Sequence, residues 1–378
     1  MSVKSISSIE TPCALLDKSR LQDNIHNIQR IADTQHVNVR PHVKTHKCLE
    51  IFQLQDEAGA VGITASKTDE ALTFINNGVQ SVTVAYPLVV DSKLDRLVAV
   101  SSSHRVDLRL TLDSFYGLEM ITRVAKRHGA EINIFLKIDV GLHRCGVRED
   151  DPLVLELARA IQEESSLNFL GLLSHAGHAY GAENSDQVRQ IARNEYQILN
   201  RVRAKLEKKQ IRVKEISVGS TPTVLASEDY DVITEIRPGN YVFMDRTPLR
   251  LGLIQSQQIA LSVLATVVSV NPEYFIIDAG SKVLSSDQGA HGIAGMEGYG
   301  LAYPLEHFDD FSHEMVVLKL SEEHGFVSRQ NFDLPIGSVI RINPNHSCAV
   351  ANLADSYVIA NGDQVIDKWQ IAARGQVH

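Results

Sequence analysis

A lysine between two histidines is the first residue of this chain whose surroundings could support chemistry. Lys44 lies in the stretch 38–47, NVRPHVKTHK, after a strand-like alternation and close in sequence to Arg40, His42 and His46. Neighbouring cations and partial burial lower the pKa of a lysine amine, which is what a Schiff-base nucleophile needs. From this stretch alone, a basic loop that binds an anion or faces water is the alternative.

Composition limits the classes of protein to consider. The 378 residues suit two domains, and 44% hydrophobic with 22% charged residues is ordinary for a soluble protein. A net charge of −9 without blocks of like charge argues against a nucleic-acid partner. The N-terminus has no apolar signal core and no apolar stretch is long enough to span a bilayer, so we expect a cytoplasmic protein without a membrane partner. The cysteines have no CxxC spacing, which indicates neither a disulfide framework nor a zinc knuckle: Cys13, Cys48, Cys145 and Cys348.

One unit repeats over residues 13–243: a short apolar run, a polar turn and a helical pattern. The apolar runs are CALLD, NVRPHVK, AVGITAS, SVTVAYP, DLRLTLD, EINIFLKID, LNFLGLLSHA, EISVGST and VITEIRPG. Helical patterns include 17–34, 68–77, 114–127, 152–164 and 185–210. About eight such units predict a closed parallel barrel with helices outside. A doubly wound open sheet is the competitor, but no GxGxxG follows the first run.

The rhythm changes after about residue 251. β-branched runs joined by Gly, Asn and Pro turns follow one another without a long helix between them. This pattern is typical of antiparallel β structure. We therefore expect a barrel domain over residues 11–248 and a β domain over 249–378, which residues 1–10 could join.

Polar residues stand where successive barrel strands are predicted to end. In such barrels the C-terminal strand ends form the active site. Each residue alone could be a turn or cap residue, but their coincidence with successive strand ends favours one site. They are Lys44, Ser66, Tyr86, Asp113, Asp139, His175, Ser220 and Arg237.

The last two strand ends resemble a phosphate cradle. VGSTPT (218–223) supplies a glycine, two hydroxyls and a proline that opens a short helix, and RPGNYVF (237–243) supplies a second glycine. Barrel enzymes often hold a phosphate between the final two strand loops with backbone donors. A pair of tight turns with a Ser/Thr cap is the alternative.

Two more loops carry candidate ring contacts. DVGLHRCG (139–146) places Arg144 where it could contact an anionic ring oxygen, or pair with Asp139. SHAGHAY (174–180) offers His175, His178 and Tyr180. The two histidines could suggest a metal, but no third ligand lies nearby in sequence, so a ring-stacking histidine or a polar cluster is favoured.

A histidine and a cysteine occur together in the predicted β domain. In INPNHSCAVANLAD (342–355), His346 and Cys348 alternate along a predicted strand or loop, so both side chains could point the same way. Imidazole and thiolate suit Zn²⁺, and two protein ligands leave positions for water and substrate. A buried cysteine beside a structural histidine is the commoner case for an isolated pair.

The ordered set RPHVKTHK, GLHRCG, SHAGHAY, VGSTPT, RPGNYVF and PNHSC resembles the fold-type III pyridoxal-phosphate enzymes. The closest group is D-threonine aldolase, eukaryotic-type D-serine dehydratase and D-threo-3-hydroxyaspartate dehydratase, and the likeness covers about residues 11–369. The resemblance implies an α/β fold: an alanine-racemase-like TIM (β/α)8 barrel with a C-terminal antiparallel β domain that carries the metal pair. It also implies a homodimer.

The resemblance further implies a role for each candidate residue. Lys44 would be catalytic and would hold pyridoxal 5'-phosphate covalently. Tyr180 would be catalytic and would approach the pyridine nitrogen or the substrate, while Arg144 would face the ring oxygen and His175 would lie against the ring. The phosphate would be bound by Gly219, Ser220, Thr221, Gly239 and Asn240. The metal ligands would be His346 and Cys348.

The metal ligands also distinguish between members of the group. Its aldolases often carry aspartate as the second ligand, with Mn²⁺, whereas its dehydratases carry His and Cys and use zinc. Cys348 therefore favours zinc-assisted dehydration of a D-amino acid, D-serine or D-threo-3-hydroxyaspartate, to a 2-oxo acid and ammonia. Retro-aldol cleavage to glycine and an aldehyde is the alternative. An amino-acid racemase would need an acid/base group on the face opposite Lys44, and the motifs show none that is certain. A non-catalytic cofactor carrier would lack the β domain. Both functions are therefore less favoured.

Overall fold

The computed structural model describes residues 4–289, 296–308, 310–330 and 332–378, which divide into two compact units. The barrel unit comprises residues 28–179, 185–239 and 375–378, and the β unit comprises residues 1–27, 180–184 and 240–374. The division expected at 248/249 stays a prediction. Of the segment expected to join the β domain, residues 1–3 lie outside the described residues.

A parallel sheet closes on itself in the barrel unit. Its strands follow the chain order around the sheet, and a parallel bridge between His42 and Thr64 joins the first strand's end to the second strand. This confirms the predicted alanine-racemase-like barrel. A short strand, β8 (Val147–Arg148), pairs with β7 outside this path. The barrel strands are β3 (Asn38–Val39), β4 (Ile63–Ala65), β5 (Ser81–Val84), β6 (Asp107–Leu112), β7 (Ile132–Asp139), β9 (Leu167–Leu173), β10 (Glu215–Val218) and β11 (Glu235–Ile236).

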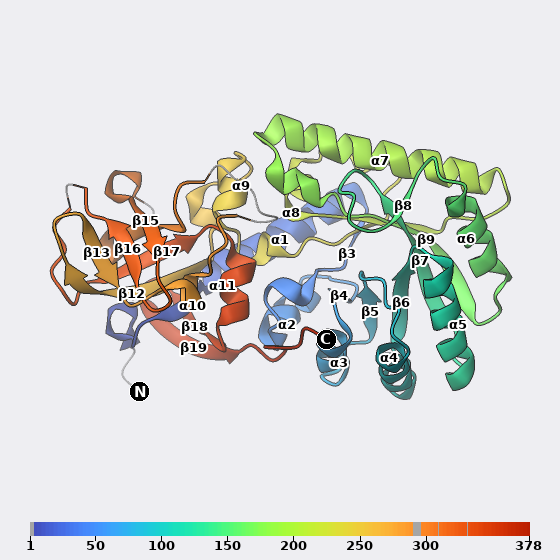
Figure 1. The fold of residues 1–378 in the computed structure, drawn as a ribbon, viewed down its shortest axis with the longest axis horizontal. Coiled ribbons are helices and arrows are strands. Elements are labelled where there is room, and N and C mark those ends of the chain that lie inside the picture. The colour runs from blue at the N-terminus through green and yellow to red at the C-terminus, as the bar shows by residue number, and fades with distance from the viewer. Residues whose placement is uncertain (1–3, 290–295, 309, 331) are drawn as a thin grey trace. The chain divides into compact units, whose positions relative to one another are not determined.

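Helices alternate with these strands and cover the outside of the sheet (Figure 1). The helix α5 shows how the sequence sets their ends: Ser114 Oγ accepts the Gly117 N–H at its start, and Gly129 adopts φ +59° at its end. Its apolar residues recur at helical spacing, so one face packs on the sheet. The helices are α1 (Lys18–Gln35), α2 (Leu49–Glu57), α3 (Thr68–Ile75), α4 (Asp91–His104), α5 (Phe115–His128), α6 (Leu153–Glu163), α7 (Ser185–Glu207) and α8 (Thr221–Ala226).

Charged groups close the N-terminal end of the barrel. Arg40 is 2% exposed and its Nε lies 2.7 Å from Glu235 Oε2, while its Nη1 donates to Ser81 Oγ. Ser81 and Glu235 are the first residues of their strands. The polar strand-end residues predicted for catalysis all stand at or after the opposite, C-terminal strand ends.

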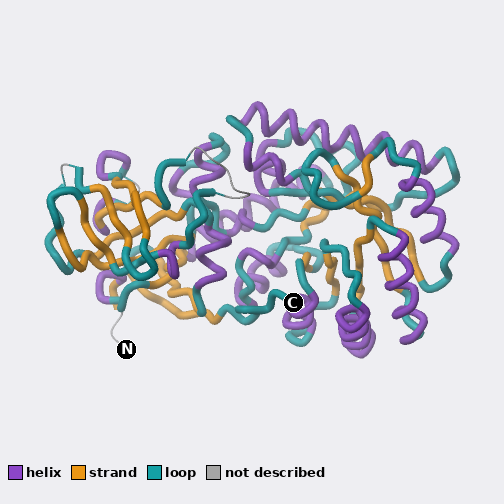
Figure 2. Tube along the Cα trace, viewed as in Figure 1, coloured by secondary structure: helices purple, strands orange, loops and turns teal. Residues whose placement is uncertain are grey.

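The β unit contains a ten-stranded, mainly antiparallel sheet, which confirms the predicted class of this half. Pairing of β12 with both β13 and β17 closes six of its strands into a barrel. Figure 2 shows the strands of this unit in orange, with loops and short helices between them. Its helices are α9 (Arg246–Arg250), α10 (Ser281–Leu284) and α11 (Ser347–Leu353). Its strands are β1 (Lys4–Ser5), β2 (Cys13–Asp17), β12 (Leu261–Val270), β13 (Tyr274–Ile277), β14 (Gly300–Pro304), β15 (Met315–Leu320), β16 (Gly325–Ser328), β17 (Val339–Pro344), β18 (Ser356–Asn361) and β19 (Gln364–Gln370).

The run CALLD was expected to be the first barrel strand, and this prediction is wrong. It forms β2, which pairs antiparallel with β12 and parallel with β18 inside the β unit. Its central residues are buried on both faces, as in a parallel barrel strand, so its composition does not reveal to which sheet it belongs. No helix within the described residues is both long and apolar enough to cross a bilayer.

Candidate active site

The loop that carries Lys44 is fixed on both sides by the neighbouring barrel strands. Lys44 lies in a 3-10 turn, η2 (Val43–Thr45), and is half-buried. On one side the His42 N–H donates to Pro238 O at 2.9 Å, and on the other the Thr64 N–H donates to Pro41 O at 2.8 Å. The backbone of Lys44 is therefore held between the two ends of the closed sheet.

Cationic and imidazole groups surround the Lys44 amine. Burial lowers the pKa of both His42 and His175 well below the usual range, and the charge of Lys44 lowers each further. Lys137, which is 4% exposed on β7, has its pKa lowered to about 8 by burial and by the charge of Arg237. These imidazoles are neutral near pH 7, and the positive potential around Lys44 favours an anionic ligand.

Arg144 lies on the exposed loop after β7, near this cluster. Its charge adds to the effects of burial and of Lys44 in lowering the pKa of His175, whereas the hydrogen bond to Gly219 raises that pKa. Asp139 was the alternative partner of Arg144, but its carboxylate instead accepts from the backbone of Gly141 and His143, and from His143 Nδ1 at 2.7 Å. The guanidinium is thus not committed to Asp139.

Two glycines at the final barrel strand ends allow a close approach of backbone segments. Gly219 has φ +142°, and a Cβ there would lie 2.8 Å from Arg237 N; a Cβ on Gly239 would lie 2.9 Å from Thr45 Oγ1. The carbonyl of Gly219 is also 2.6 Å from His175 Nδ1. No larger residue fits either position without displacing the loops around Lys44.

The hydroxyl groups after β10 are not equivalent. Ser220 caps α8, and its Oγ and backbone N–H are already bonded to Thr223 in a capping box. Thr221 Oγ1, in contrast, is buried and has no hydrogen-bond partner among the described residues. An orphaned buried hydroxyl calls for a ligand oxygen or water, so this cradle fits a phosphate, with Thr221 rather than Ser220 supplying the side chain.

The remaining predicted residues belong to the β unit. The Asn240 amide donates to Asp245 Oδ2 at 2.8 Å and its oxygen accepts from Ser347 Oγ. The side chain of Asn240 is therefore engaged within the β unit, and its contact with a phosphate stays a prediction. Tyr180, in η3 (Gly177–Gly181), is 9% exposed, and its carbonyl accepts from Arg250 at 3.2 Å.

His346 and Cys348 come together, but not for the reason that their spacing suggested. β17 ends at Pro344, His346 is the N-cap of α11, and Cys348 lies in the first turn of that helix. Of the two expected settings, a strand or a loop, the strand is excluded, and Cys348 lies in a helix. The pair meets because the chain turns into a helix, and Asp245 holds this turn by accepting the Ser347 N–H at 3.0 Å.

The electrostatics around His346 fit a cation. Burial would lower the pKa of His346, but its contact with Cys348 and nearby carboxylates raise it to about 10. One carboxylate, Asp287, lies 3.0 Å from His346 Nδ1, and the other, Asp245, is fully buried. A carboxylate on one ring nitrogen of a histidine is the usual outer partner of a metal-bound imidazole, so these residues fit a divalent metal.

Sequence reasoning missed Lys137, Asp245 and Asp287. Lys137 could have been found, because a lysine inside the apolar run EINIFLKID must face either the barrel interior or a partner. Asp245 had only the signal of a helix cap before α9. Asp287 lies 59 positions before its histidine partner, and nothing local marks it.

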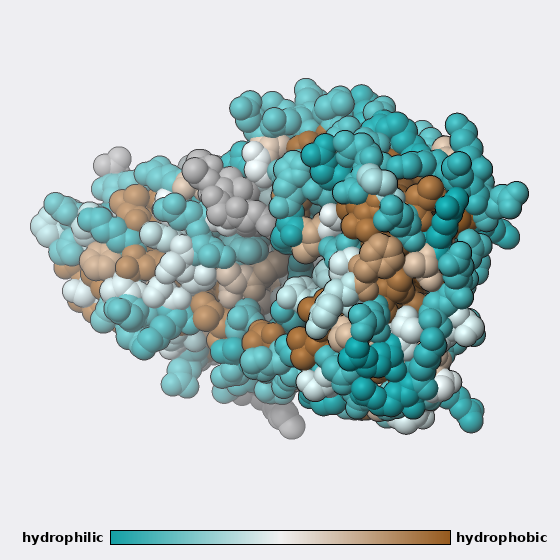
Figure 3. All heavy atoms as spheres, turned by 45° about the vertical axis from the view of Figure 1, so that its right-hand side comes forward, coloured by the Kyte–Doolittle hydropathy of each residue, from teal (hydrophilic) through white to brown (hydrophobic). Residues whose placement is uncertain are grey.

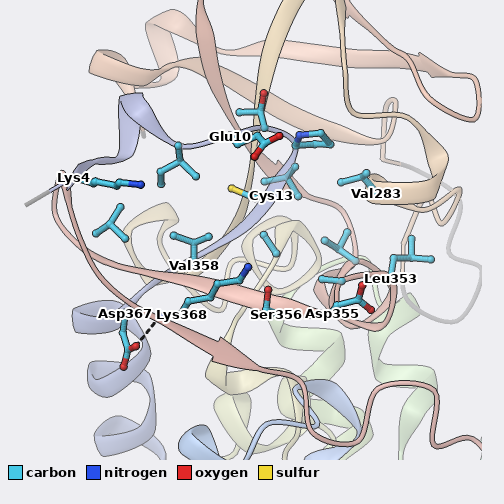
Figure 4. Close-up of a pocket in the computed structure, with 18 of the residues that line it drawn as sticks. Lys4, Glu10, Cys13, Val283, Leu353, Asp355, Ser356, Val358, Asp367 and Lys368 are labelled. Carbon is cyan, nitrogen blue, oxygen red and sulfur yellow. Dashed lines mark hydrogen bonds between the residues drawn. The ribbon is translucent and has the colours of Figure 1, made fainter.

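Two features of the β unit lie apart from the predicted residues. A cavity of about 710 Å³ is lined by residues of β1, β2, α11, β18 and β19. Lys4, Cys13 and Lys368 lie on its wall (Figure 4). None of the predicted site residues lines it. His307, Asp310 and His313 form a surface group with metal-ligating atoms within 4.8 Å of one another.

Comparison with known families identifies the chain. The family described as "Alanine racemase, N-terminal domain" matches residues 16–247. The chain belongs to this family. The "Putative serine dehydratase domain" matches residues 260–360, so this alanine racemase-like protein carries the second domain of the group that its motifs resemble.

Relatives of this alanine racemase-like protein match over nearly its whole length. The D-threo-3-hydroxyaspartate dehydratase of Delftia sp. is 31% identical over 97% of this chain and 98% of its own, and its solved structure has a TM-score of 0.89. The D-serine dehydratase of Dictyostelium discoideum is 31% identical, covering 97% of each chain. The D-threonine aldolase of Arthrobacter sp. is 30% identical over 98% of this chain and 94% of its own. The predicted family and fold are confirmed.

Proposed function

We propose that this protein is a pyridoxal-phosphate- and metal-dependent lyase that dehydrates a β-hydroxy D-amino acid to a 2-oxo acid and ammonia. Two of the three relatives described above are dehydratases of such substrates. Lys44, in its cationic loop, is the proposed cofactor-bearing and catalytic lysine, and Tyr180 is a second proposed catalytic residue.

The barrel unit supplies the groups proposed to hold the cofactor. Gly219, Gly239 and Thr221 fit a phosphate by close backbone approach and a buried hydroxyl. The imidazole of His175 is fixed by Gly219 O and neutral, which suits contact with an aromatic ring. Once released from the cofactor, the Lys44 Nζ is the base proposed to take the α-proton, because its cationic surroundings favour a neutral amine.

The turn containing His346 and Cys348 supports dehydration over aldol cleavage. A thiolate and an imidazole select zinc over harder ions. When bound, pyridoxal phosphate supplies an electron sink and a divalent metal supplies Lewis acidity toward the β-hydroxyl. Asp287 and Asp245 supply the negative charge that a cation at this turn requires.

Substrate choice depends on the cations available to a second carboxylate. Arg40 is excluded, because its guanidinium is buried at the N-terminal end of the barrel with Glu235 and Ser81. Arg250 donates to two backbone carbonyls. Arg246 is half-buried and donates to Asn345 Oδ1, beside His346 in sequence. Arg246 is thus the arginine of these three that is hydrogen-bonded to the residue preceding His346.

A product assay tests the proposal. The purified protein, supplied with pyridoxal phosphate and zinc, is given D-serine, D-threonine or D-threo-3-hydroxyaspartate, and ammonia, 2-oxo acid and glycine are measured in parallel. We expect ammonia and oxo acid, abolished by EDTA and absent with Lys44→Ala. Glycine and an aldehyde would show an aldolase, as in the Arthrobacter relative, and would overturn the dehydratase assignment.

The homodimer is also a proposal. Large apolar side chains are exposed in the loop after β5 and in the first turn of α5. A hydrophobic area also interrupts a mainly hydrophilic surface in the space-filling view (Figure 3). Such patches mark interaction surfaces. The exposed residues are Tyr86, Val89, Val90, Phe115 and Tyr116. Light scattering after size exclusion would give twice the monomer mass, and a monomer would exclude the dimer.

A further inference from the structure

A buried carboxylate lies beneath the lysine loop. Glu70, in the first turn of α3, is 1% exposed. Its Oε2 accepts the Ser66 N–H at 2.6 Å, and its Oε1 lies 3.9 Å from Lys47 Nζ. A buried carboxylate with a backbone donor and a cation is charge-paired, so it can remain ionised at a position where an isolated one would not.

Lys47 is itself fixed from three directions. It is 6% exposed and takes φ +52°, a left-handed conformation that is uncommon for a lysine. Its N–H donates to Val43 O at 2.8 Å, which closes the turn that contains Lys44. Its ammonium donates to Gln376 O at 3.2 Å, in the segment 375–378, whose last residue also accepts the Asp69 N–H of α3 (Figure 1).

A hydrogen-bonded path leads from Glu70 to Lys44. Ser66, whose N–H is bound by Glu70, has its Oγ 3.4 Å from His42 Nε2. The other ring nitrogen of His42 accepts the Lys44 N–H at 3.5 Å. Substitution at Glu70 can therefore affect the turn of Lys44 through Ser66 and His42, as well as through its charge.

The charges facing these residues have opposite signs. The pKa of Glu70 is raised overall, because burial outweighs the opposing effects of the Ser66 N–H and of the charges of Lys47, Lys44 and Lys67. Around Lys44 the other charged and titratable groups are His42, His175, Lys137, Arg144 and Arg237. Glu70 is thus a negative charge that acts on Lys44 from beneath a cluster of cations.

We propose that Glu70 and Lys47 are positioning residues for Lys44: Glu70 favours the ammonium form of the Lys44 amine, and Lys47 limits that effect and anchors the turn. The pair would set the pH range over which Lys44 can bind the cofactor or take a proton. This inference rests on the proposed role of Lys44 as the cofactor-bearing lysine.

Opposite charge effects make the inference testable. The rate at which pyridoxal phosphate recombines with the apoprotein is measured by cofactor absorbance at a series of pH values. The pH midpoint of this rate reports the ionisation of the Lys44 amine. Glu70→Gln should move this midpoint down by about one unit, because a nearby opposite charge no longer favours the ammonium. Lys47→Met should move it up, and Lys47→Arg should restore the wild-type midpoint.

A matched control is available on the same helix turn. Asp69→Asn removes the same charge one position away, where the carboxylate pairs with Arg96 at 2.7 Å, and should leave the midpoint unchanged. Midpoints that do not move, or that move in the same direction for both single variants, would overturn the inference. If Glu70→Gln does not fold, the upward shift of Lys47→Met decides.

The failure of the proposed function would look different. With Lys44→Ala, the covalent-cofactor absorbance band should be lost. A band that persists would refute Lys44 as the cofactor lysine. A lost band, with unmoved midpoints in the other variants, would refute only the positioning role of Glu70 and Lys47.

Discussion

Replacing Glu195 by glutamine tests whether this buried carboxyl group, which is bonded to Ser174 beside His175, carries a proton in the folded protein. Glu195 lies on α7, is 0% exposed, and accepts a hydrogen bond from Ser174 Oγ at 2.5 Å. Burial raises its pKa from 4.5 to about 7, although the Ser174 hydroxyl and the charge of Arg237 oppose the shift. A glutamine has the same shape and can keep the bond to Ser174, but it cannot ionise.

The expected change in unfolding free energy follows from the raised pKa of Glu195. A pKa raised from 4.5 to about 7 corresponds to about 3 kcal/mol, at about 1.4 kcal/mol per unit. The folded protein binds this proton more tightly than the unfolded chain, so its contribution to stability is complete below about pH 4.5 and is lost as the pH rises through about 7. Relative to wild type, Glu195→Gln should gain about 2–3 kcal/mol of unfolding free energy between about pH 5 and pH 8.

Urea unfolding of the holoprotein across this pH range measures the difference. Glu207→Gln is the matched control, because Glu207 is exposed on the same helix and loses the same charge. The control should track wild type at every pH. Parallel stability curves for Glu195→Gln and wild type would refute the reasoning, since they would mean that Glu195 is ionised in the folded protein near neutral pH.

Two further outcomes concern the cofactor cradle and the metal turn. Gly219→Ala should lower cofactor affinity by about tenfold or more, because the new Cβ would lie 2.8 Å from Arg237 N. Absorbance titration measures this affinity, and an unchanged value would contradict the close packing. Cys348→Asp should shift metal preference from zinc toward manganese, measured by metal content after dialysis against both ions, with Cys145→Ala as control. A preference unchanged from wild type would exclude Cys348 as a ligand.

The repeating pattern of apolar runs was enough to predict the barrel, because parallel strands are buried on both faces and carry their polar residues at their ends. The strand-end residues from Lys44 to Arg237 follow from that regularity. The same property explains the error at β2. A strand buried on both faces has one composition whether it lies in a parallel barrel or at the centre of a mixed sheet, and only the pairing distinguishes them.

Contacts between residues that are distant in sequence could not be predicted from the sequence. The pair His346 and Cys348 was identified by residue type, but the turn that unites it depends on Asp245, about a hundred positions earlier. Glu70 and Lys47 were not singled out, because a glutamate in the first turn of a helix and a lysine in a basic loop are ordinary surface patterns. Their burial follows from tertiary packing, which local sequence does not encode.

The closure of the barrel at β3 has a consequence for its local stability. β3 and β11 contribute two residues each, and β3 joins β4 through an isolated bridge, whereas β7 and β9 run side by side over most of their lengths. The seam of the barrel is therefore its shortest hydrogen-bonded ladder, and it lies on the strand that leads to Lys44. Backbone amides at this seam should open to solvent exchange more readily than those of β7 and β9. A ligand that binds across the seam would slow that opening, and comparing amide exchange with and without pyridoxal phosphate would show whether the proposed cofactor does so.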